Sequence, residues 1–332
     1  MTASKILSEN TKIVDAELRK FLPKKIDVKW LRRNFGIKAY DVHAANTFLA
    51  NPVWDILERG GKRWRPLLML LMHGAVGGNP KKIRKFAILP ELIHNGSLIA
   101  DDVEDNSHTR RGKPALHKLY GTDIAVNASN LLYGISMLIV RDAKLDDNTK
   151  RKIYETINDE LLNLHIGQGT DIVWHRKQGK VTERMYLAMC ANKTGAIARL
   201  AAKLGIILAN GHDEQVNELG KFAECLGIAF QIQDDVLNLK GGLGKDTGED
   251  ITEGKMSLPV IRTLEKAGKR DKKTLLRILQ IHSKDKKDID TAISIIRHYN
   301  ALEYSIKVAE KIIEKAWDES EYRLPASEYK NK

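Results

Sequence analysis

The chain of 332 residues has little cysteine, proline or aromatic content. Its two cysteines, Cys190 and Cys225, form no metal or redox spacing, so we expect both to be reduced core residues. With only eight prolines and no low-complexity tract, disorder is not expected. Hydrophobic residues make up 42% of the chain, which is enough for a sizeable core in one large domain or two ordinary ones.

Long apolar runs are absent as well. No window reaches the ~18 apolar residues of a membrane span, and the N-terminal "MTASKILSENTK" lacks the apolar run of a signal peptide. These absences predict a cytoplasmic protein. The net charge is +12, but aromatics make up only 6% of the chain and no nucleic-acid motif occurs. We therefore expect small anions as ligands, with a transient membrane-surface contact as the second interpretation and no nucleic acid.

Apolar residues recur at helical spacing through most of the chain. The segments with this pattern are 85–105, 151–174, 217–239 and 291–317. Glycine and proline fall between the helices, as in "ERGGKRWRP" and "KGGLGKDTGED", and no strand-like alternation persists. Because no composition break marks a boundary, residues 1–332 are predicted to form a single all-α domain.

The stretch "LIADDVED" places carboxylates at the end of an apolar helix. Asp101 and Asp105 are four residues apart and share a helix face, with Asp102 and Glu104 beside them. A solvated helix end is the simpler interpretation, but the preceding "LIHNGSLIA" is apolar enough to be buried. Like charges at this spacing destabilise a helix unless a cation compensates them. All-oxygen ligands of this kind suit Mg²⁺.

A second acidic cluster has the same spacing. "FQIQDDVLN" carries Asp234, Asp235 and Asn238 on another apolar helix. Two such helices facing each other could hold Mg²⁺ between protein carboxylates and substrate phosphates. Three basic loops accompany the clusters, with Lys62, Arg63 and Arg65, with Arg110 and Arg111, and with Lys245 and Lys255. Together they indicate diphosphate sites, one bridged by metal and one held by direct contacts.

These motifs resemble those of the trans-prenyl diphosphate synthases, and most closely the geranylgeranyl diphosphate synthases. "DDVED" and "FQIQDD" resemble the two aspartate-rich motifs of the family. "GGKRWRP", "GQGTD", "KTG" and "GKDTGEDITEGK" resemble further family segments, in family order from about residue 58 to 260. The resemblance implies an isoprenoid synthase fold, which is one large helical bundle around a central active-site cavity. It also implies a homodimer that uses two or three Mg²⁺ ions.

The resemblance implies roles residue by residue. Metal binding is implied for Asp101, Asp105 and Asp234, and catalytic roles for Asp101, Asp102, Asp105, Lys193, Asp234 and Lys245. The residues implied in binding isopentenyl diphosphate are Gly61, Lys62, Arg65, His94 and Arg111. Those implied around the allylic diphosphate are Arg110, Lys193, Thr194, Gln231, Asn238, Lys245 and Lys255. In this interpretation the two adjacent arginines face phosphates rather than simply neutralising the aspartates.

Four polar residues have a second possible role. His94 lies in an apolar helix, where an isolated histidine is more often a core residue, and only its place in the motif argues otherwise. Asn238 stands where many relatives carry Asp, so we expect it to bond to the allylic diphosphate and not to the metal. Gln168 and Asp171 are expected to brace Lys193 or a metal-bound water.

The implied reaction joins isopentenyl diphosphate head to tail with dimethylallyl, geranyl or farnesyl diphosphate and releases diphosphate. A longer-chain polyprenyl diphosphate synthase, a class I terpene cyclase and an inactive regulatory subunit remain alternatives. A cyclase needs no second diphosphate site, so "GGKRWRP" argues against it. A silent subunit would tend to lose aspartates or basic residues, and both sets are intact here.

The length of the product is predicted from the helix before the first acidic cluster. One helical turn rises about 5.4 Å, which is close to an extended isoprene unit, so Gly96 and Ser97 lie about one turn below that cluster. Relatives that stop at fifteen carbons carry bulky aromatics there, so small residues should let the tail pass. The resemblance places the tunnel floor at Tyr133 and His165, although Gly134 replaces an aromatic of those relatives. We therefore expect geranylgeranyl diphosphate as the main product.

Overall fold

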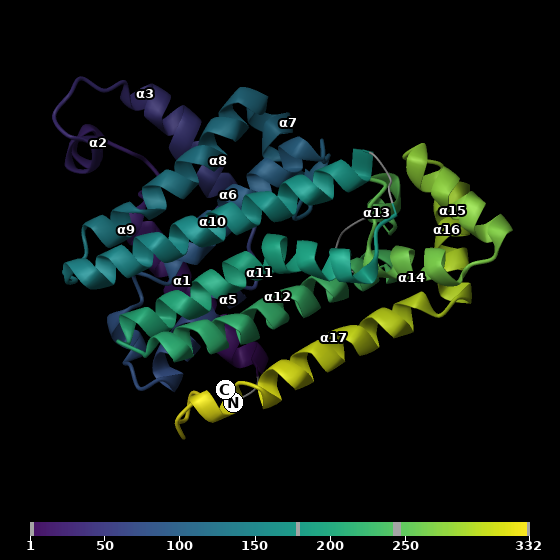
Figure 1. The fold of residues 1–332 in the computed structure, drawn as a ribbon. Coiled ribbons are helices and arrows are strands. Elements are labelled where there is room, and N and C mark those ends of the chain that lie inside the picture. The colour runs from purple at the N-terminus through teal and green to yellow at the C-terminus, as the bar shows by residue number, and fades with distance from the viewer. Residues whose placement is uncertain (1–2, 177–179, 242–246, 331–332) are drawn as a thin grey trace. The chain divides into compact units, whose positions relative to one another are not determined.

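The computed structural model describes residues 3–176, 180–241 and 247–330, and these residues are almost entirely helical (Figure 1). The predicted all-α fold class is therefore confirmed. The chain divides into two compact units. The first unit comprises Met1–Ile157, Leu200–Asn217 and Leu324–Lys332, and the second comprises Asn158–Arg199 and Glu218–Arg323. The single domain over residues 1–332 stays a prediction.

The first unit contains the first acidic cluster and two of the basic loops. Its elements are α1 (Ala3–Phe21), α2 (Val28–Phe35), α3 (Val42–Ala45), the π-helical turn η1 (Asn46–Ala50), α4 (Asn51–Glu58), α5 (Trp64–Ala75), the 3₁₀ turn η2 (Pro80–Lys82), α6 (Ile88–Glu104), the strands β1 (Thr109–Arg110) and β2 (Lys113–Pro114), α7 (Leu116–Tyr120), α8 (Thr122–Ser136) and α9 (Leu138–Arg141).

Three long helices contribute residues to both units. They are α10 (Asp147–Arg176), α11 (Glu183–Leu208) and α12 (Asp213–Lys240). The second unit also contains α13 (Glu249–Thr252), α14 (Leu258–Lys266), α15 (Lys269–Gln280), α16 (Lys286–His298), α17 (Ala301–Asp318) and the 3₁₀ turn η3 (Glu321–Arg323).

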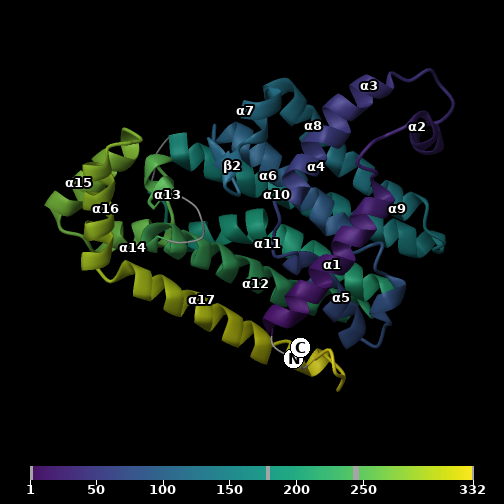
Figure 2. The ribbon, with the colours of Figure 1, turned by 180° about the vertical axis from the view of Figure 1, so that it is seen from behind.

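Helices α6 and α8 lie side by side and form the centre of the first unit (Figure 1). Leu89, Leu92 and Ile93 of α6 and Leu132 of α8 are fully buried. Each such side chain contributes roughly 1.5–3 kcal/mol by leaving water. The N-terminal helix α1 packs against α5 (Figure 2). As a result, the start of the chain lies against the helix that directly follows "GGKR".

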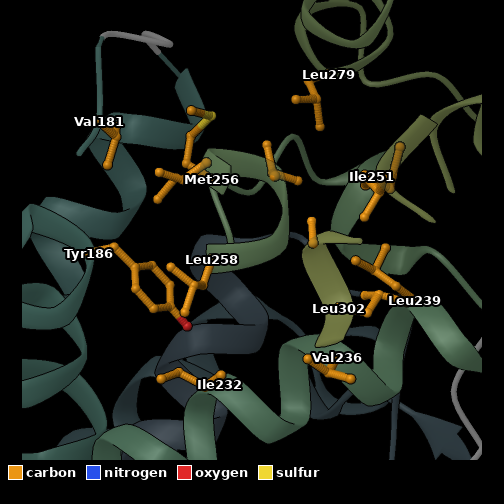
Figure 3. Packing of buried hydrophobic residues seen from close by; sticks show 14 of the residues in the cluster. Val181, Tyr186, Ile232, Val236, Leu239, Ile251, Met256, Leu258, Leu279 and Leu302 are labelled. Atoms are coloured by element: carbon orange, nitrogen blue, oxygen red, sulfur yellow. The ribbon is translucent and has the colours of Figure 1, made fainter. Parts of the chain in front are cut away.

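The core of the second unit is built from α11, α12 and the helices that follow them. Figure 3 shows Ile232 and Val236 of α12 in one hydrophobic cluster with Leu258 of α14 and Tyr186 of α11. Helix α17 packs against α14, and α15 packs against α16 (Figure 1). Tyr186 is only 1% exposed, so its hydroxyl group must find a partner inside this core.

Three of the four predicted helices are confirmed, and one is wrong in part. Helices α6, α10 and α12 match the segments 85–105, 151–174 and 217–239. The segment 291–317 is divided between α16 and α17, because Asn300 adopts a left-handed backbone conformation with φ 52°. Asparagine is one of the few residues that tolerate this conformation, which cannot continue a right-handed helix.

The expectation that no window could span a membrane is wrong, because one segment is long and apolar enough to do so. The segment Thr122–Arg141, which holds α8 and α9, reaches a mean hydropathy of 1.4, and 44% of that window is buried. Ala125, Ala128 and Leu132 in this segment have no exposed surface, so its apolar character is used in packing the first unit. The cytoplasmic location stays a prediction.

Candidate functional site

A tight turn in "TRRGKP" places the two adjacent arginines differently, Arg110 on a strand and Arg111 in the turn itself. Strands β1 and β2 pair antiparallel with Arg110 opposite Lys113. The turn residues Arg111 and Gly112 both have positive φ, 52° and 73°. Two consecutive positive φ values are typical of a type I′ hairpin turn. This hairpin was missed in the sequence, because its two-residue strands are too short to show an alternating pattern.

Arg110 holds the acidic end of α6. Its Nε donates to Asp102 Oδ1 over 2.8 Å, and its Nη2 donates to Asp101 Oδ2 over 3.2 Å. Burial raises the pKa of Asp102, while the neighbouring Arg110 acts in the opposite direction. The expectation that Arg110 faces phosphates rather than neutralising aspartates therefore needs correction, because its guanidinium is bonded to both carboxylates. Its contact with an allylic diphosphate stays a prediction.

The carboxylates of α6 fit a hard divalent cation. The N–H of Asp105 donates to the Asp101 carbonyl oxygen over 2.9 Å, which places both half-buried side chains one turn apart. Oδ2 of Asp102 is buried without a hydrogen-bond partner among the described residues. Across residues 3–176, 180–241 and 247–330, no three His, Cys, Asp or Glu side chains gather as a complete metal site. Mg²⁺ suits such an arrangement, because it commonly takes one or two carboxylates and completes its shell with water and substrate phosphates.

Arg111 belongs to a second group of side chains, which is cationic. Its Nη1 donates to the Ile56 carbonyl oxygen over 3.2 Å and to Asn95 Oδ1 over 3.4 Å. Burial lowers the pKa of Arg111 to about 10 and that of Arg65 to about 10. Burial, Arg65 and Arg111 lower the pKa of His94 well below its usual value, so its imidazole is neutral at pH 7. These mutual effects place the three side chains of Arg65, His94 and Arg111 close together.

This cationic cluster contains a buried donor that no side chain or carbonyl group of the described residues satisfies. Nε of Arg65 is buried and has no hydrogen-bond partner within the described part of the chain. The backbone at Gly61 has φ 140°, and a Cβ there would lie 3.1 Å from Nη2 of Arg111. Glycine therefore allows the loop to approach the guanidinium closely. Lys62 lies in the same loop and is exposed. A buried donor without a partner is costly, so the cluster is suited to an anionic ligand.

In the second unit, Asp171 of α10 holds Lys193 of α11. Lys193 Nζ donates to Asp171 Oδ2 over 2.7 Å, and His175 Nε2 lies 2.8 Å from Asp171 Oδ1. Burial would raise the pKa of Asp171, but Lys193, His175 and Lys255 outweigh burial and lower it. Asp171 is therefore an anion that fixes the Lys193 ammonium, which matches the expectation that it braces this lysine.

A chain of hydrogen bonds links α11 to α12. Thr194 Oγ1 donates to Gln231 Oε1 over 2.7 Å, and Gln231 Nε2 donates to Asp235 Oδ1 over 2.9 Å. The Tyr186 hydroxyl donates to Asp235 Oδ2 over 2.6 Å. Burial and the nearby Asp250 raise the pKa of Asp235 to about 7. Tyr186 was missed in the sequence, because nothing there separates a hydrogen-bonding tyrosine from an ordinary core ring.

The segment after α12 is anchored by Asn238 and Lys255. Asn238 Oδ1 accepts the backbone N–H of Asp250 over 3.2 Å, and its Nδ2 is buried without a partner in the part of the chain described. The Lys255 ammonium lies 3.6 Å from Asp250 and also contacts Glu253. Lys245 lies outside the described residues. The contacts of these side chains with a diphosphate stay predictions.

Gly96 is small for a reason that the sequence did not show. Helix α8 lies against it, so a Cβ at Gly96 would come within 3.2 Å of the Ser129 carbonyl oxygen and 3.3 Å of Tyr133 Cε1. Ser129 Oγ also donates to the Gly96 carbonyl oxygen over 2.8 Å. A large residue at Gly96 would therefore push against backbone of α8 before it reached any tunnel. Its effect on chain length stays a prediction.

The other chain-length residues differ in exposure. Ser97 is half-buried, and its hydroxyl donates to the His94 carbonyl oxygen over 2.8 Å. Gly134 is exposed, and a Cβ there would meet no described atom within 4 Å. His165 is exposed on α10 and belongs to the second unit. The tunnel floor formed by Tyr133 and His165 therefore stays a prediction.

Comparison with known proteins decides the family. A model of the family described as polyprenyl synthetase matches residues 46–296. The chain belongs to the polyprenyl synthetase family. Its family match extends beyond the motifs of residues 58–260 on both sides.

Named relatives within this family include archaeal proteins. The chain is 37% identical to a short chain isoprenyl diphosphate synthase of Methanothermobacter thermautotrophicus over 76% of this chain and 78% of the relative. It is 33% identical to a geranylgeranyl diphosphate synthase of Saccharolobus solfataricus over 84% of both. The crystal structure of a geranylgeranyl pyrophosphate synthetase from Pyrococcus horikoshii matches 98% of this chain and 95% of that one, with a TM-score of 0.85 and 31% identity.

Proposed function

We propose that this polyprenyl synthetase family member condenses isopentenyl diphosphate head to tail with allylic diphosphates and makes geranylgeranyl diphosphate as its main product. One observation carries the proposal. Within the first unit, the adjacent residues Arg110 and Arg111 belong to two different groups, an acidic group with Asp101 and Asp102 and a cationic group with Arg65. The first group suits a diphosphate bound through metal, and the second suits one bound directly. Head-to-tail condensation needs both, and the names of the archaeal relatives support the product.

The cationic cluster is the proposed binding site for isopentenyl diphosphate. Arg65 and Arg111 stay protonated at pH 7 because each has a pKa of about 10. Their guanidinium groups can donate paired hydrogen bonds to phosphate oxygens. The neutral imidazole of His94 adds a donor without adding charge repulsion. Gly61 and Lys62 would complete the site from the loop.

Two or three Mg²⁺ ions are proposed as cofactors, with Asp101 and Asp105 as proposed ligands from the first unit; Asp234 is a proposed metal ligand of the second unit. When bound, such ions neutralise the allylic diphosphate and make it a better leaving group. Asp171 holds the ammonium of Lys193, and a preorganised cation stabilises charge that develops on the leaving diphosphate. Thr194 and the other predicted allylic residues would bind the same group.

In the remaining steps the protein mainly has to hold the two substrates in position. Departure of diphosphate leaves an allylic carbocation, the double bond of isopentenyl diphosphate attacks it, and one proton is lost to the released diphosphate. Burial and Asp235 raise the pKa of Cys190 well above its usual value, so this thiol is not a nucleophile at pH 7. The proposed reaction therefore proceeds without covalent catalysis by this cysteine.

The function is tested by incubating the protein with isopentenyl diphosphate, Mg²⁺ and each allylic diphosphate in turn, followed by chromatography of the products. We expect consumption of isopentenyl diphosphate and a twenty-carbon product. Conversion of an allylic diphosphate alone would favour a class I terpene cyclase. Main products of twenty-five carbons or more would favour a longer-chain synthase, and no turnover with any substrate would favour a regulatory subunit.

We also propose that the protein is a homodimer. The support from this chain is an exposed apolar stripe on α10, formed by Leu162, Ile166 and Val173, which are 56%, 60% and 54% exposed. These residues recur at helical spacing and so share one face, and a second copy of the chain would bury them. Light scattering at micromolar concentration should give twice the 37.4 kDa of the chain. A monomer mass would refute the proposal.

A further inference from the structure

The N-terminal helix makes two polar contacts with Arg63, at the end of the loop that contains Gly61 and leads into α5. Asn10 of α1 is 4% exposed, and its Nδ2 donates to the Arg63 carbonyl oxygen over 2.9 Å. Asp15, also on α1, accepts a hydrogen bond from Arg63 Nε over 3.3 Å. Both contacts lie within the first unit. Helix α1 precedes the residues that match the family model, so that match says nothing of these contacts.

Arg63 is the centre of this arrangement, and it is not available to a ligand. It is 3% exposed. Its Nη1 donates to Glu91 Oε1 over 2.6 Å, and its Nη2 donates to the Leu57 carbonyl oxygen over 2.7 Å. Each nitrogen of the guanidinium therefore bonds to a different helix, namely α1, α4 or α6. Arg63 serves as a buried anchor, although its neighbours Lys62 and Arg65 belong to the proposed binding site.

The same carboxylate that holds Arg63 also serves the binding arginines. Glu91 Oε1 accepts a hydrogen bond from Asn95 Nδ2 over 2.8 Å, and Asn95 Oδ1 accepts one from Arg111 Nη1 over 3.4 Å. Glu91 is also the acid that favours the charged forms of Arg65 and Arg111. A continuous set of contacts therefore runs from α1 through Arg63 and Glu91 to the proposed isopentenyl diphosphate site.

The loop depends on such contacts for its shape. Gly60, Gly61 and Arg63 all have positive φ, 86°, 140° and 47°. Arg63 is the residue before α5, and no side-chain hydrogen bond caps the helix there. A left-handed conformation is unfavourable for arginine and persists only where surrounding structure enforces it. Asn10 bonds the carbonyl group of this very residue, so it is placed to enforce the conformation.

We propose that Asn10 and Glu91 are positioning residues for isopentenyl diphosphate, which act through Arg63 to hold the loop of residues 59–63, and the start of α5 with Arg65, in the binding conformation. The inference rests on the proposed function and gives a role to a helix outside the family match. It predicts a selective defect, because the allylic diphosphate does not contact this loop in the proposed assignment.

The test is Asn10→Asp, which keeps the size of the side chain but replaces the donor with a carboxylate facing a carbonyl oxygen. We expect the KM for isopentenyl diphosphate to rise roughly tenfold, as for the loss of one well-formed buried hydrogen bond. The KM for farnesyl diphosphate should change by less than about twofold, as for a contact that is not altered. Rates are measured by varying each substrate with the other saturating.

A matched control is Asn46→Asp. Asn46 Nδ2 also donates to a backbone carbonyl, that of Ile26, over 2.9 Å, and its other hydrogen bonds join it to Val42 and to the N–H of Ile26, which lie outside the loop. This variant should lower the melting temperature by a similar amount while leaving both KM values unchanged. If Asn10→Asp proves too unstable, Asp15→Ala removes the outer contact. The Asp15 side chain is 40% exposed, so this variant should give a smaller but equally selective rise.

The outcomes separate the two hypotheses. Wild-type protein that does not consume isopentenyl diphosphate would overturn the proposed function. Active wild-type protein, with folded variants in which both KM values rise equally or neither changes, would overturn only the positioning role. A selective rise that is absent in Asn46→Asp supports both, because a merely structural defect would appear in the control as well.

Discussion

Replacing Arg111 with glutamine should weaken binding of isopentenyl diphosphate far more than binding of the allylic substrate. Arg111 is buried enough for its pKa to fall to about 10, and it stays charged at the pH of an enzyme assay. A hydrogen bond from a charged group contributes ~1.5–3 kcal/mol, so the KM for isopentenyl diphosphate should rise roughly ten- to a hundredfold. Glutamine retains some of the size of the side chain but none of its charge.

The effect on stability should be smaller than the effect on binding. Among the described residues, the side chain of Arg111 makes long hydrogen bonds, 3.2 Å to Ile56 and 3.4 Å to Asn95. Bonds of this length are weak, and removing a buried charge from a cationic cluster offsets part of their loss. We therefore expect the free energy of unfolding in denaturant to change by about 1 kcal/mol or less.

Arg110→Gln is the matched control, because it removes the same charge one residue away. The Arg110 guanidinium bonds to Asp101 and Asp102. The variant should raise the KM of the allylic substrate or the concentration of Mg²⁺ needed, with the KM for isopentenyl diphosphate changed by less than about threefold, as for an independent site. Equal rises in KM for both substrates in both variants would refute the assignment of Arg110 to the allylic diphosphate and of Arg111 to isopentenyl diphosphate.

Three further outcomes are expected. Asp101→Ala should lower turnover ~100-fold or more, as for loss of a main electrostatic contact in the transition state, while helical circular dichroism is retained; full activity in excess EDTA would contradict a metal site. Ser97→Phe should shorten the main product and His165→Ala should lengthen it, as measured by chromatography; an unchanged product with Ser97→Phe would show that the tail does not follow α6. Because the pKa of His94 is lowered from 6.5 in the folded protein, the unfolded chain binds more protons than the folded protein below about pH 6.5. The free energy of unfolding therefore decreases as the pH decreases in that range. His94→Gln should make the free energy of unfolding less dependent on pH in that range, and an unchanged slope in denaturant titrations would contradict it.

Gly96→Phe is a poorer probe of the tunnel than Ser97→Phe. The Cβ of any residue at Gly96 already presses against the Ser129 carbonyl oxygen, which belongs to backbone and cannot move aside cheaply. Overpacking of this kind costs ~1–3 kcal/mol, so a change in product with this variant would mix loss of packing with a blocked tail. Ser97 is half-buried and already carries a Cβ, so Ser97→Phe does not add one to the face packed on Ser129.

The acidic and basic motifs, the all-α class and the helices α6, α10 and α12 could be predicted from the sequence. Asp101 and Asp105 share a face because the period of the helix is a property of the backbone, and local spacing is sufficient to predict it. The break at Asn300 was not predicted, because the apolar pattern of residues 291–317 continues across it while one backbone angle does not. Local pattern predicts where helices are favoured, but a single left-handed residue can end one.

The sequence by itself determined which chemical groups this protein carries, and in what order. It could not determine that Arg110 bonds to the aspartates of α6 while Arg111 joins Arg65 and His94, because that division depends on a turn with two positive φ values. It also gave no sign that Asn10 reaches Arg63, fifty-three residues away. Contacts between distant segments are set by how helices pack, and only the tertiary structure decides which polar side chains meet when their helices are buried against each other.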